Sequence, residues 1–447
     1  MHASRLTMRR RDLLKVGAAA TTLVTSGCSS LPPISSFSSF ASIEAMLAKR
    51  SAGPPDAAAS APSGAASAAE AVTQAPVAPV RGLPAYAAWK DPDSLIVHGA
   101  HLVETKRGAL GTGVITPLQQ LYVRNNLPPP DESVLADRDA WALAVEGVGR
   151  PGTVSLRELK SMGLETVAMV LQCSGNGRGL YAGKIPGTPW MVGAAGCVVW
   201  SGVPVRVLAQ KLGGVADGAL FITGTGGEVL PEGVDPKDAV VERSVPIMAL
   251  GQALLAWELN GVPLPLAHGG PLRLVFPGYQ GINNIKYVKR LAFTESETTA
   301  RIMSHGYRLT PLGAPAGPGQ ISVWETELKS WIDSPHPESG VLAAGTVLVR
   351  GVAFGGGGRP IKRVEVSANG GRNWAEAKLT GPDLGPYAWR QFVLPMPLGA
   401  GTYTLVSRAT DVLGNVQPER CISNVHGYNN TSWIDHAVQV VVAPKAG

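Results

Sequence analysis

The chain has little cysteine, few aromatic residues and little charge. Four cysteines cannot cross-link a chain of 447 residues, and none of them forms the Cys-x-x-Cys pair used by zinc and redox sites. The lack of Cys-x-x-Cys-His also excludes covalent haem of the c type. No apolar run reaches about 18 residues, so we expect no helix that spans a membrane. Hydrophobic residues still make up 45% of the chain, which excludes a wholly disordered protein.

The excess of basic residues is small. Lys and Arg total 39 and Asp and Glu total 33, which gives a net charge of +6, and no dense basic run follows the N-terminus. This balance suits small anions or an acidic protein partner, and we expect no nucleic-acid partner. The 54 glycines and 36 prolines indicate much loop and β structure.

Residues 1–28 have the pattern of an export signal. The basic residues 9–11 precede a short apolar run from Val16 to Val24. Adjacent arginines before such a run resemble a twin-arginine signal, which predicts export to the periplasm. Gly27 and Cys28 resemble a bacterial lipobox, so a lipid anchor at Cys28 and a plain cleavage site both stay open.

Three further segments follow the signal. Residues 29–85 are rich in Ala, Ser and Pro and predict a linker. Residues 86–318 mix strand-like and helix-like patterns, which favours an α+β domain. The strand-like runs are Trp141–Val145, Val167–Leu171 and Leu272–Phe276, and the helix-like runs are Ser155–Met162, with Ser155 as a cap, and Val203–Leu212.

Residues 319–447 show short alternating strands separated by turn residues. Lys362–Ser367 and Thr402–Val406 are two such strands, and Asn369–Gly371 and Gly414–Asn415 are turns. This spacing predicts an immunoglobulin-like β-sandwich.

Cys173 is the first candidate for chemistry. It ends a predicted strand within Leu171–Arg178, and glycines open the loop that follows. A neighbouring Arg178 favours the thiolate, which is the nucleophilic and metal-binding form. An inert buried thiol is the alternative.

Two basic clusters are candidates for anion binding. Arg124 precedes the proline run 128–130 and either binds an oxyanion or forms a surface ion pair. His268, Arg273 and Lys286 lie in one short segment that suits a phosphate or a polar heterocycle, although a lone histidine is more often structural. The glycines at 224–227 lack the spacing of a dinucleotide fingerprint.

Together these segments resemble the sulfite oxidase family of molybdenum enzymes. The resemblance covers nearly the whole chain after residue 90, and it implies a sulfite-oxidase-type molybdopterin domain at 86–318 and a dimerisation domain at 319–447, hence a homodimer. The segments that carry it are Tyr122–Pro130, Leu171–Arg178, Trp190 with Gly193–Ala194, His268–Lys286, Gly355–Arg359 and Val364–Trp374.

The resemblance implies a molybdenum–molybdopterin cofactor, with Cys173 as the thiolate ligand of the metal. Arg124 and Arg178 are implied to bind the anionic substrate, Tyr307 matches the active-site tyrosine, and Trp190 matches a pocket tryptophan. The residues implied to hold the pterin and its phosphate are Tyr122, Arg124, Asn125, Asn126, His268, Arg273, Asn284, Ile285 and Lys286.

The implied reaction is oxidation of sulfite, or of a related reduced sulfur compound, by oxygen-atom transfer. No haem, flavin or iron–sulfur motif occurs in this chain, so we expect an external electron acceptor, a cytochrome c. Asn126 stands where the family usually has histidine, and no arginine follows Trp433. A third anion-binding arginine is therefore unassigned, with Arg359 as a weak candidate, and sulfite specificity is less well supported than molybdenum binding.

Two other functions stay open. A cysteine hydrolase would need Cys173 and His268 within about 2.6–3.2 Å of each other. A tethered binding protein without catalysis is the other alternative. Cys197 and Cys421 are expected in the core, where a disulfide between them is allowed in an oxidising compartment.

Overall fold

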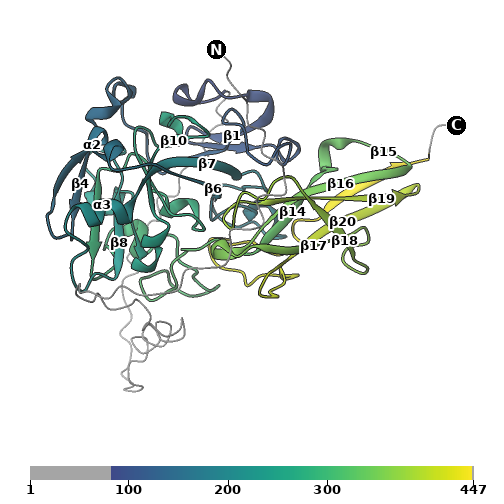
Figure 1. Ribbon diagram of the computed structural model, residues 1–447. Helices are drawn as coiled ribbons and strands as arrows, with labels where there is room; N and C mark the ends of the chain where they lie inside the picture. Colours follow the sequence, from purple (N-terminus) through teal and green to yellow (C-terminus); the bar gives the residue numbers. More distant parts are fainter. Residues whose placement is uncertain (1–81, 445–447) are drawn as a thin grey trace, which may run out of the picture. The chain divides into compact units, whose positions relative to one another are not determined.

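The computed structural model describes residues 82–444 and consists mostly of β-sheet (Figure 1). The predicted export signal, the lipobox at Cys28 and nearly all of the predicted linker lie outside these residues. Among residues 82–444, no helix combines the length and apolarity that crossing a bilayer requires.

The residues before 318 form three sheets. A small antiparallel sheet has the order β1-β2-β3, and a second has the order β11-β10-β7-β6 with β12 also paired to β10. The third has the order β5-β4-β13-β8-β9, in which only β13 and β4 run parallel. The strands are β1 (Leu95–Gly99), β2 (Leu102–Thr105), β3 (Val123–Arg124), β4 (Ala142–Glu146), β5 (Gly152–Ser155), β6 (Glu165–Gln172), β7 (Ala195–Pro204), β8 (Phe221–Thr225), β9 (Glu242–Pro246), β10 (Leu254–Leu259), β11 (Val262–Pro263), β12 (Arg273–Val275) and β13 (Arg290–Thr294).

The helices of the described residues, including two in the C-terminal region, are all short. The α-helices are α2 (Leu156–Ser161), α3 (Val205–Lys211), α4 (Pro236–Ala239) and α5 (Arg301–Ser304). The 3-10 helices are η2 (Ala85–Ala87), η3 (Pro92–Ser94), η4 (Arg107–Ala109), η5 (Glu132–Leu135), η6 (Arg138–Ala140), η7 (Arg178–Leu180), η8 (Ile247–Gly251), η9 (Leu266–His268), η10 (Gly281–Asn283), η11 (Pro337–Ser339) and η12 (Gly356–Gly358).

Helix α2 shows why local sequence predicts its position. Ser155 caps the helix: its hydroxyl accepts from the Glu158 backbone N–H at 3.2 Å, and the Glu158 carboxylate accepts from the Ser155 backbone N–H at 2.7 Å. This reciprocal capping box satisfies two donors that the helix leaves free. Leu156 and Leu159 are buried on its inner face. The predicted helix at 155–162 is thus confirmed.

The C-terminal region is a single eight-stranded path, β14-β16-β19-β18-β17-β20-β21-β15. It curls over a core of alternating inward residues such as Ile332, Val349, Val364 and Leu405. A hydrogen bond of 3.0 Å between the hydroxyls of Ser330 and Ser407 joins the first strand, β14, to β20. The strands are β14 (Lys329–Ser334), β15 (Leu342–Ala343), β16 (Gly345–Phe354), β17 (Ile361–Ser367), β18 (Ala375–Thr380), β19 (Arg390–Leu398), β20 (Gly401–Asp411) and β21 (Val438–Ala443).

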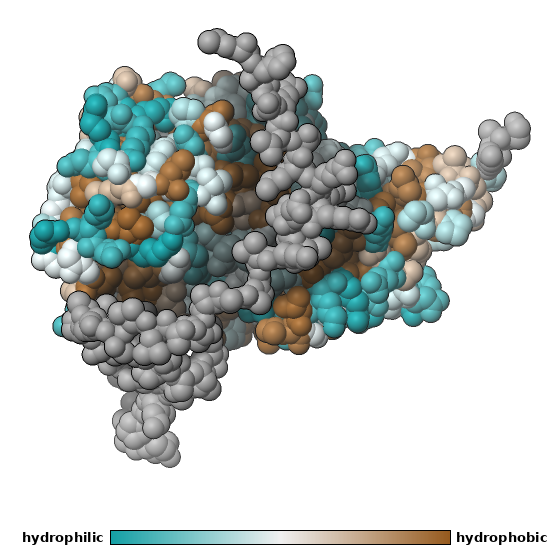
Figure 2. All heavy atoms as spheres, in the orientation of Figure 1, coloured by the Kyte–Doolittle hydropathy of each residue, from teal (hydrophilic) through white to brown (hydrophobic). Residues whose placement is uncertain are grey.

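The architecture is therefore mixed α and β with sheets predominating. The curled C-terminal sheet is compatible with an immunoglobulin-like domain, and that finer classification stays a prediction. Hydrophilic and apolar residues are interspersed over the face of the first region seen in Figure 2.

Candidate active site

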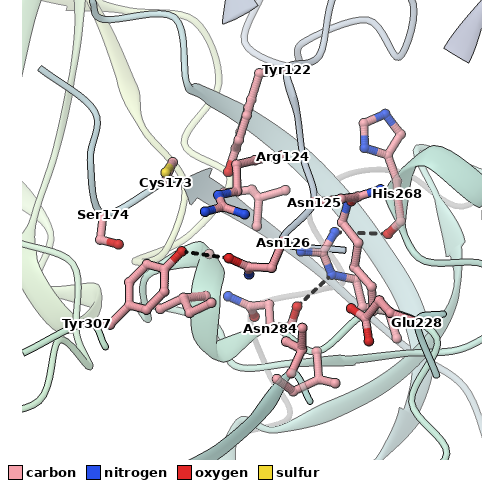
Figure 3. A pocket seen from close by; sticks show the side chains of 17 residues that line it. Tyr122, Arg124, Asn125, Asn126, Cys173, Ser174, Glu228, His268, Asn284 and Tyr307 are labelled. Atoms are coloured by element: carbon pink, nitrogen blue, oxygen red, sulfur yellow. Dashed lines mark hydrogen bonds between the residues drawn. The ribbon is translucent and has the colours of Figure 1, made fainter. Parts of the chain in front are cut away.

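Many of the predicted site residues line one pocket (Figure 3). The pocket holds about 580 Å³ of space between atoms, part of it open to solvent. The predicted residues on its wall are Tyr122, Arg124, Asn125, Asn126, Cys173, His268, Arg273, Asn284, Ile285, Lys286 and Tyr307.

Cys173 is placed by the pairing of β6 with β7. That ladder runs to the pair Gln172–Ala195, so Cys173 is the first residue beyond it, and its backbone N–H donates to Ala194 O at 2.9 Å. Its side chain is 8% exposed and lies on the pocket wall beside Ser174. His268 lies on the other side of the pocket in Figure 3. The structure does not bring these two residues together as a hydrolase requires.

Buried cations occupy the end of the pocket away from Cys173. Arg273 Nε donates to Asn284 O at 3.1 Å and its Nη1 donates to His268 O at 2.9 Å. Lys286 Nζ donates to Asn125 Oδ1 and, at 2.6 Å, to Ala267 O. Burial lowers the pKa of Arg273 to about 10. Burial, and then the charge of Arg273, holds the pKa of Lys286 well below its usual value.

Glu228 also lines the pocket, and sequence reasoning missed it. It follows β8 directly after Gly226 and Gly227. The one sequence feature that could have pointed to it as a pocket residue is an acidic side chain in a glycine-containing loop at the end of a strand. Burial raises the pKa of its carboxyl group to about 7, against the opposing effect of Lys286 and Arg273.

His268 is buried in η9 at the start of the same basic segment. Burial, followed by the charges of Lys90 and Lys286, holds its pKa well below the usual value, so the imidazole is neutral. A neutral ring has one nitrogen that donates and one that accepts. His268 can therefore bind a polar ligand edge without adding charge.

Buried polar atoms without hydrogen-bond partners indicate whether the pocket suits a polar ligand. Four residues that line the pocket each have a buried polar atom without a hydrogen-bond partner: Asn125 Nδ2, Ser174 Oγ, Glu228 Oε2 and His268 Nε2. Buried polar atoms are normally paired, so this arrangement fits a polar heterocycle that supplies the partners. The adjacent cations fit its phosphate, and the thiol fits a soft metal. The residues present therefore fit a molybdopterin cofactor.

Arg124 and Tyr307 lie between the two ends. Arg124 ends β3, which pairs with β2 through Leu102, and its guanidinium points into the middle of the pocket in Figure 3. The Tyr307 hydroxyl donates to Asn126 Oδ1 at 3.3 Å. Tyr307 has a left-handed backbone (φ 51°), a conformation that is costly for an aromatic residue and often found at functional sites.

Arg178 and Trp190 do not line this pocket. Arg178, in η7, donates from Nε to His426 O at 2.7 Å and from Nη1 to Thr188 O at 3.0 Å. Trp190 is 1% exposed and packs edge-on against His98, with ring centroids 5.2 Å apart. Their predicted roles in substrate binding stay predictions.

The third arginine stays unassigned. Arg359 lies outside the pocket, with its Nε 3.3 Å from Asp411 Oδ2.

The two remaining cysteines of the described part are both free, so they do not form the disulfide that an oxidising compartment would allow. Cys197 is fully buried, as predicted. Cys421 is only half-buried, contrary to expectation, because it lies in a loop where its sulfur contacts the hydroxyls of Tyr181 and Ser432.

Comparison with known families and proteins adds independent findings. Residues 129–302 match the oxidoreductase molybdopterin binding domain, and residues 320–442 match the Mo-co oxidoreductase dimerisation domain. The chain is 33% identical to sulfite oxidase of Gallus gallus over 71% of this chain and 72% of that protein. It is 30% identical to the inducible nitrate reductase [NADH] 1 of Glycine max over 72% of this chain and 39% of that protein.

A solved structure is also similar. The crystal structure of the sulfane dehydrogenase SoxCD from Paracoccus pantotrophus aligns with a TM-score of 0.64 and 25% identity, covering 79% of this chain and 88% of that chain.

Proposed function

Because this chain belongs to the sulfite oxidase family of molybdenum oxidoreductases, we propose that it oxidises a small reduced sulfur compound, sulfite or a sulfane sulfur, by oxygen-atom transfer. The observation that carries the proposal is one pocket with a buried thiol at one end, buried cations at the other, and Arg124 and Tyr307 between them.

Each end of the pocket has its own task. Cys173 would give its thiolate to the metal, and Arg273 and Lys286 would hold the phosphate of the cofactor. Asn125, His268 and Glu228 hold the polar edge of its heterocycle with the atoms that are unpaired in the protein. When bound, molybdopterin supplies a metal centre that takes two electrons from the substrate and exchanges an oxygen atom with it.

The substrate is bound by residues of the chain itself. Arg124 offsets the negative charge of a sulfur oxyanion. Tyr307, whose hydroxyl is oriented by Asn126, donates a hydrogen bond to a substrate oxygen once the substrate competes for it. The Tyr307 hydroxyl already has a hydrogen-bond partner before the substrate binds, which limits the reorganisation that opposes the reaction.

A sulfane sulfur is a second candidate substrate, and two observations favour it. Asn126 carries no charge where the family usually has histidine, and no third arginine faces the pocket within residues 82–444. Fewer fixed cations stabilise a compact dianion such as sulfite less well. The similarity to a sulfane dehydrogenase also supports a sulfane sulfur as the substrate.

The proposal also covers the cellular compartment of the protein and its partners. The twin-arginine pattern supports export of the folded protein to the periplasm, and the lipobox supports a lipid anchor at Cys28. The two electrons leave one at a time to an external cytochrome c, since the chain carries no haem-binding motif. The match to a dimerisation domain supports a homodimer.

Metal analysis and a substrate screen test the proposal together. Full-length protein from a host that makes the cofactor is expected to hold one molybdenum per chain, and Cys173→Ser is expected to lose it. Turnover is measured with sulfite, thiosulfate and polysulfide, first with ferricyanide and then with cytochrome c. Loaded protein that reduces nitrate and oxidises none of these sulfur compounds contradicts the proposal.

A further inference from the structure

The loop that follows Cys173 is held from outside by the C-terminal region. Three of its carbonyl groups and two of its side chains bind groups that come after residue 328. The hydrogen bonds are Asn429 N–H to Ser174 O at 2.9 Å, Lys329 Nζ to Asn176 O at 3.1 Å, Asn430 Nδ2 to Gly177 O at 2.9 Å, and Arg178 Nε to His426 O at 2.7 Å.

Lys329 makes a second bond to the same residue. Its Nζ donates to Asn176 Oδ1 at 2.7 Å, while Asn176 Nδ2 donates to Val192 O at 2.6 Å and the Asn176 backbone N–H donates to Cys173 O at 2.9 Å. Asn176 therefore connects the ammonium group of Lys329 to the residue that carries the thiol and to the segment before β7. A displacement of Lys329 changes the conformation of the loop at Cys173.

Lys329 is also a buried amine without a counter-ion, and burial lowers its pKa to about 7. It lies in β14 with 2% exposure, and among the described residues no carboxylate lies within ion-pair distance. The titratable groups that face it are Arg107, His436, Cys421 and Cys173. Placing a charge in such a position is costly unless an anion nearby compensates.

We propose that Lys329 is a positioning residue for the metal-binding thiolate: it fixes the Cys173 loop through its two hydrogen bonds to Asn176, and its protonated amine adds a positive charge near that loop. The C-terminal region then takes part in cofactor binding as well as in dimerisation. This inference rests on the proposed role of Cys173 as the metal ligand.

A purely structural role is the competing explanation, and Lys90 offers a matched control. Lys90 is also buried, has no carboxylate partner within residues 82–444, and donates to two backbone carbonyls, Leu118 O at 2.5 Å and Leu121 O at 2.7 Å. It makes no contact with the Cys173 loop. Lys90→Met therefore reports what the loss of a buried lysine that does not support the Cys173 loop costs in melting temperature; its charge also acts on His268, so the comparison of metal content is made with Lys329→Arg as well.

The experiment compares Lys329→Met, Lys329→Arg, Lys90→Met and Cys173→Ser in the full chain. Its readouts are molybdenum per folded chain, the reduction potential of the bound metal and the melting temperature of cofactor-free protein. Lys329→Met is expected to weaken cofactor retention about 10- to 100-fold, as loss of a group supporting a metal ligand does. It is also expected to shift the reduction potential of the remaining metal to more negative values, because a positive charge is gone. Lys329→Arg is expected to keep the potential of the native protein.

The outcomes separate the two explanations. If Lys329→Met and Lys90→Met lower the melting temperature alike and leave the metal content and its potential unchanged, the inference is overturned. If Cys173→Ser keeps its molybdenum, the proposed function itself fails. Should Lys329→Met not fold, Lys329→Gln keeps a donor to Asn176 without the charge, and the same shift in potential is expected.

Discussion

The ring of Tyr307 lies flat on the ring of Tyr428, with centroids 5.2 Å apart and planes inclined by 12°. Tyr307 lines the pocket, whereas Tyr428 comes from the C-terminal region and lies behind it. The guanidinium carbon of Arg178 lies 5.4 Å from the centre of the Tyr428 ring, and the two side chains form a cation–π contact. Tyr428 thus links the pocket tyrosine to an arginine that does not itself line the pocket.

Replacing Tyr428 tests this link. Tyr428→Leu removes an aromatic stacking interaction worth about 0.5–1.5 kcal/mol, which leaves Tyr307 free to rotate. We expect the KM for the sulfur substrate to rise about 2- to 10-fold with little loss of molybdenum. Steady-state kinetics with ferricyanide measure it. Tyr428→Phe keeps the ring and is the control; equal KM values for the two variants would show that stacking is not what orients Tyr307.

The hydrogen bond from Tyr307 to Asn126 predicts a second effect. Asn126→Leu removes the acceptor, and a bond of this kind contributes about 1 kcal/mol, so kcat/KM is expected to fall about 5-fold. The cause is the lost orientation of the Tyr307 hydroxyl. A double-mutant cycle with Tyr307→Phe measures the coupling. Independent, additive effects of the two substitutions would contradict the prediction.

Arg273 is expected to matter for cofactor retention. Arg273→Met removes a buried cation from the phosphate end of the pocket. We expect retention of the cofactor to weaken about 10- to 100-fold, measured as molybdenum per chain after gel filtration. Arg138→Met is the control, because Arg138 also donates to a backbone carbonyl, Leu264 O at 2.8 Å, but lies outside the pocket. Similar metal losses in both variants would contradict the prediction.

Glu228 makes the stability of the cofactor-free protein depend on pH. Burial raises its pKa from 4.5 to about 7, so the folded state holds the proton more tightly than the unfolded chain does. This contribution to stability is complete below pH 4.5 and is lost as the pH rises through 7. The melting temperature of Glu228→Gln should therefore rise relative to the native protein as the pH increases across this interval.

Thermal unfolding over that pH interval checks the prediction for Glu228. The exposed Glu132 provides the control, since Glu132→Gln is expected to follow the native protein at each pH. A difference in melting temperature between Glu228→Gln and the native protein that stays constant with pH, or that falls, would contradict a protonated Glu228 carboxyl group in the cofactor-free protein.

Local features of the fold were predictable from the sequence. Ser155 and Glu158 cap α2 through contacts three residues apart, and the predicted strand at 167–171 lies within β6. The apolar run that predicted this strand also predicted that Cys173 lies at its end. The lining residues from 122 to 126 and from 268 to 286 were found through resemblance to a family, because no spacing rule predicts that these two segments meet.

Contacts between distant segments were not predictable. Arg178 is close to Cys173 in sequence, yet its guanidinium turns toward carbonyls of Thr188 and His426. Tyr428 lies in a loop and stacks on Tyr307, and Glu228 follows the end of β8. The directions of this loop and this strand end depend on how whole sheets pack, which the local sequence does not reveal. Cys421 looked like a core cysteine, but its position in a half-buried loop follows from hydrogen bonds to Tyr181 and Ser432, which are far apart in the chain.

The bonds from Asn429 and Asn430 to the loop after Cys173 have a consequence for biosynthesis. The ribosome makes Cys173 long before it makes these two asparagines, so the thiol loop has no complete set of partners while the chain is still growing. A chain that stops before Asn429 would therefore lack two of the hydrogen bonds that hold the loop after Cys173.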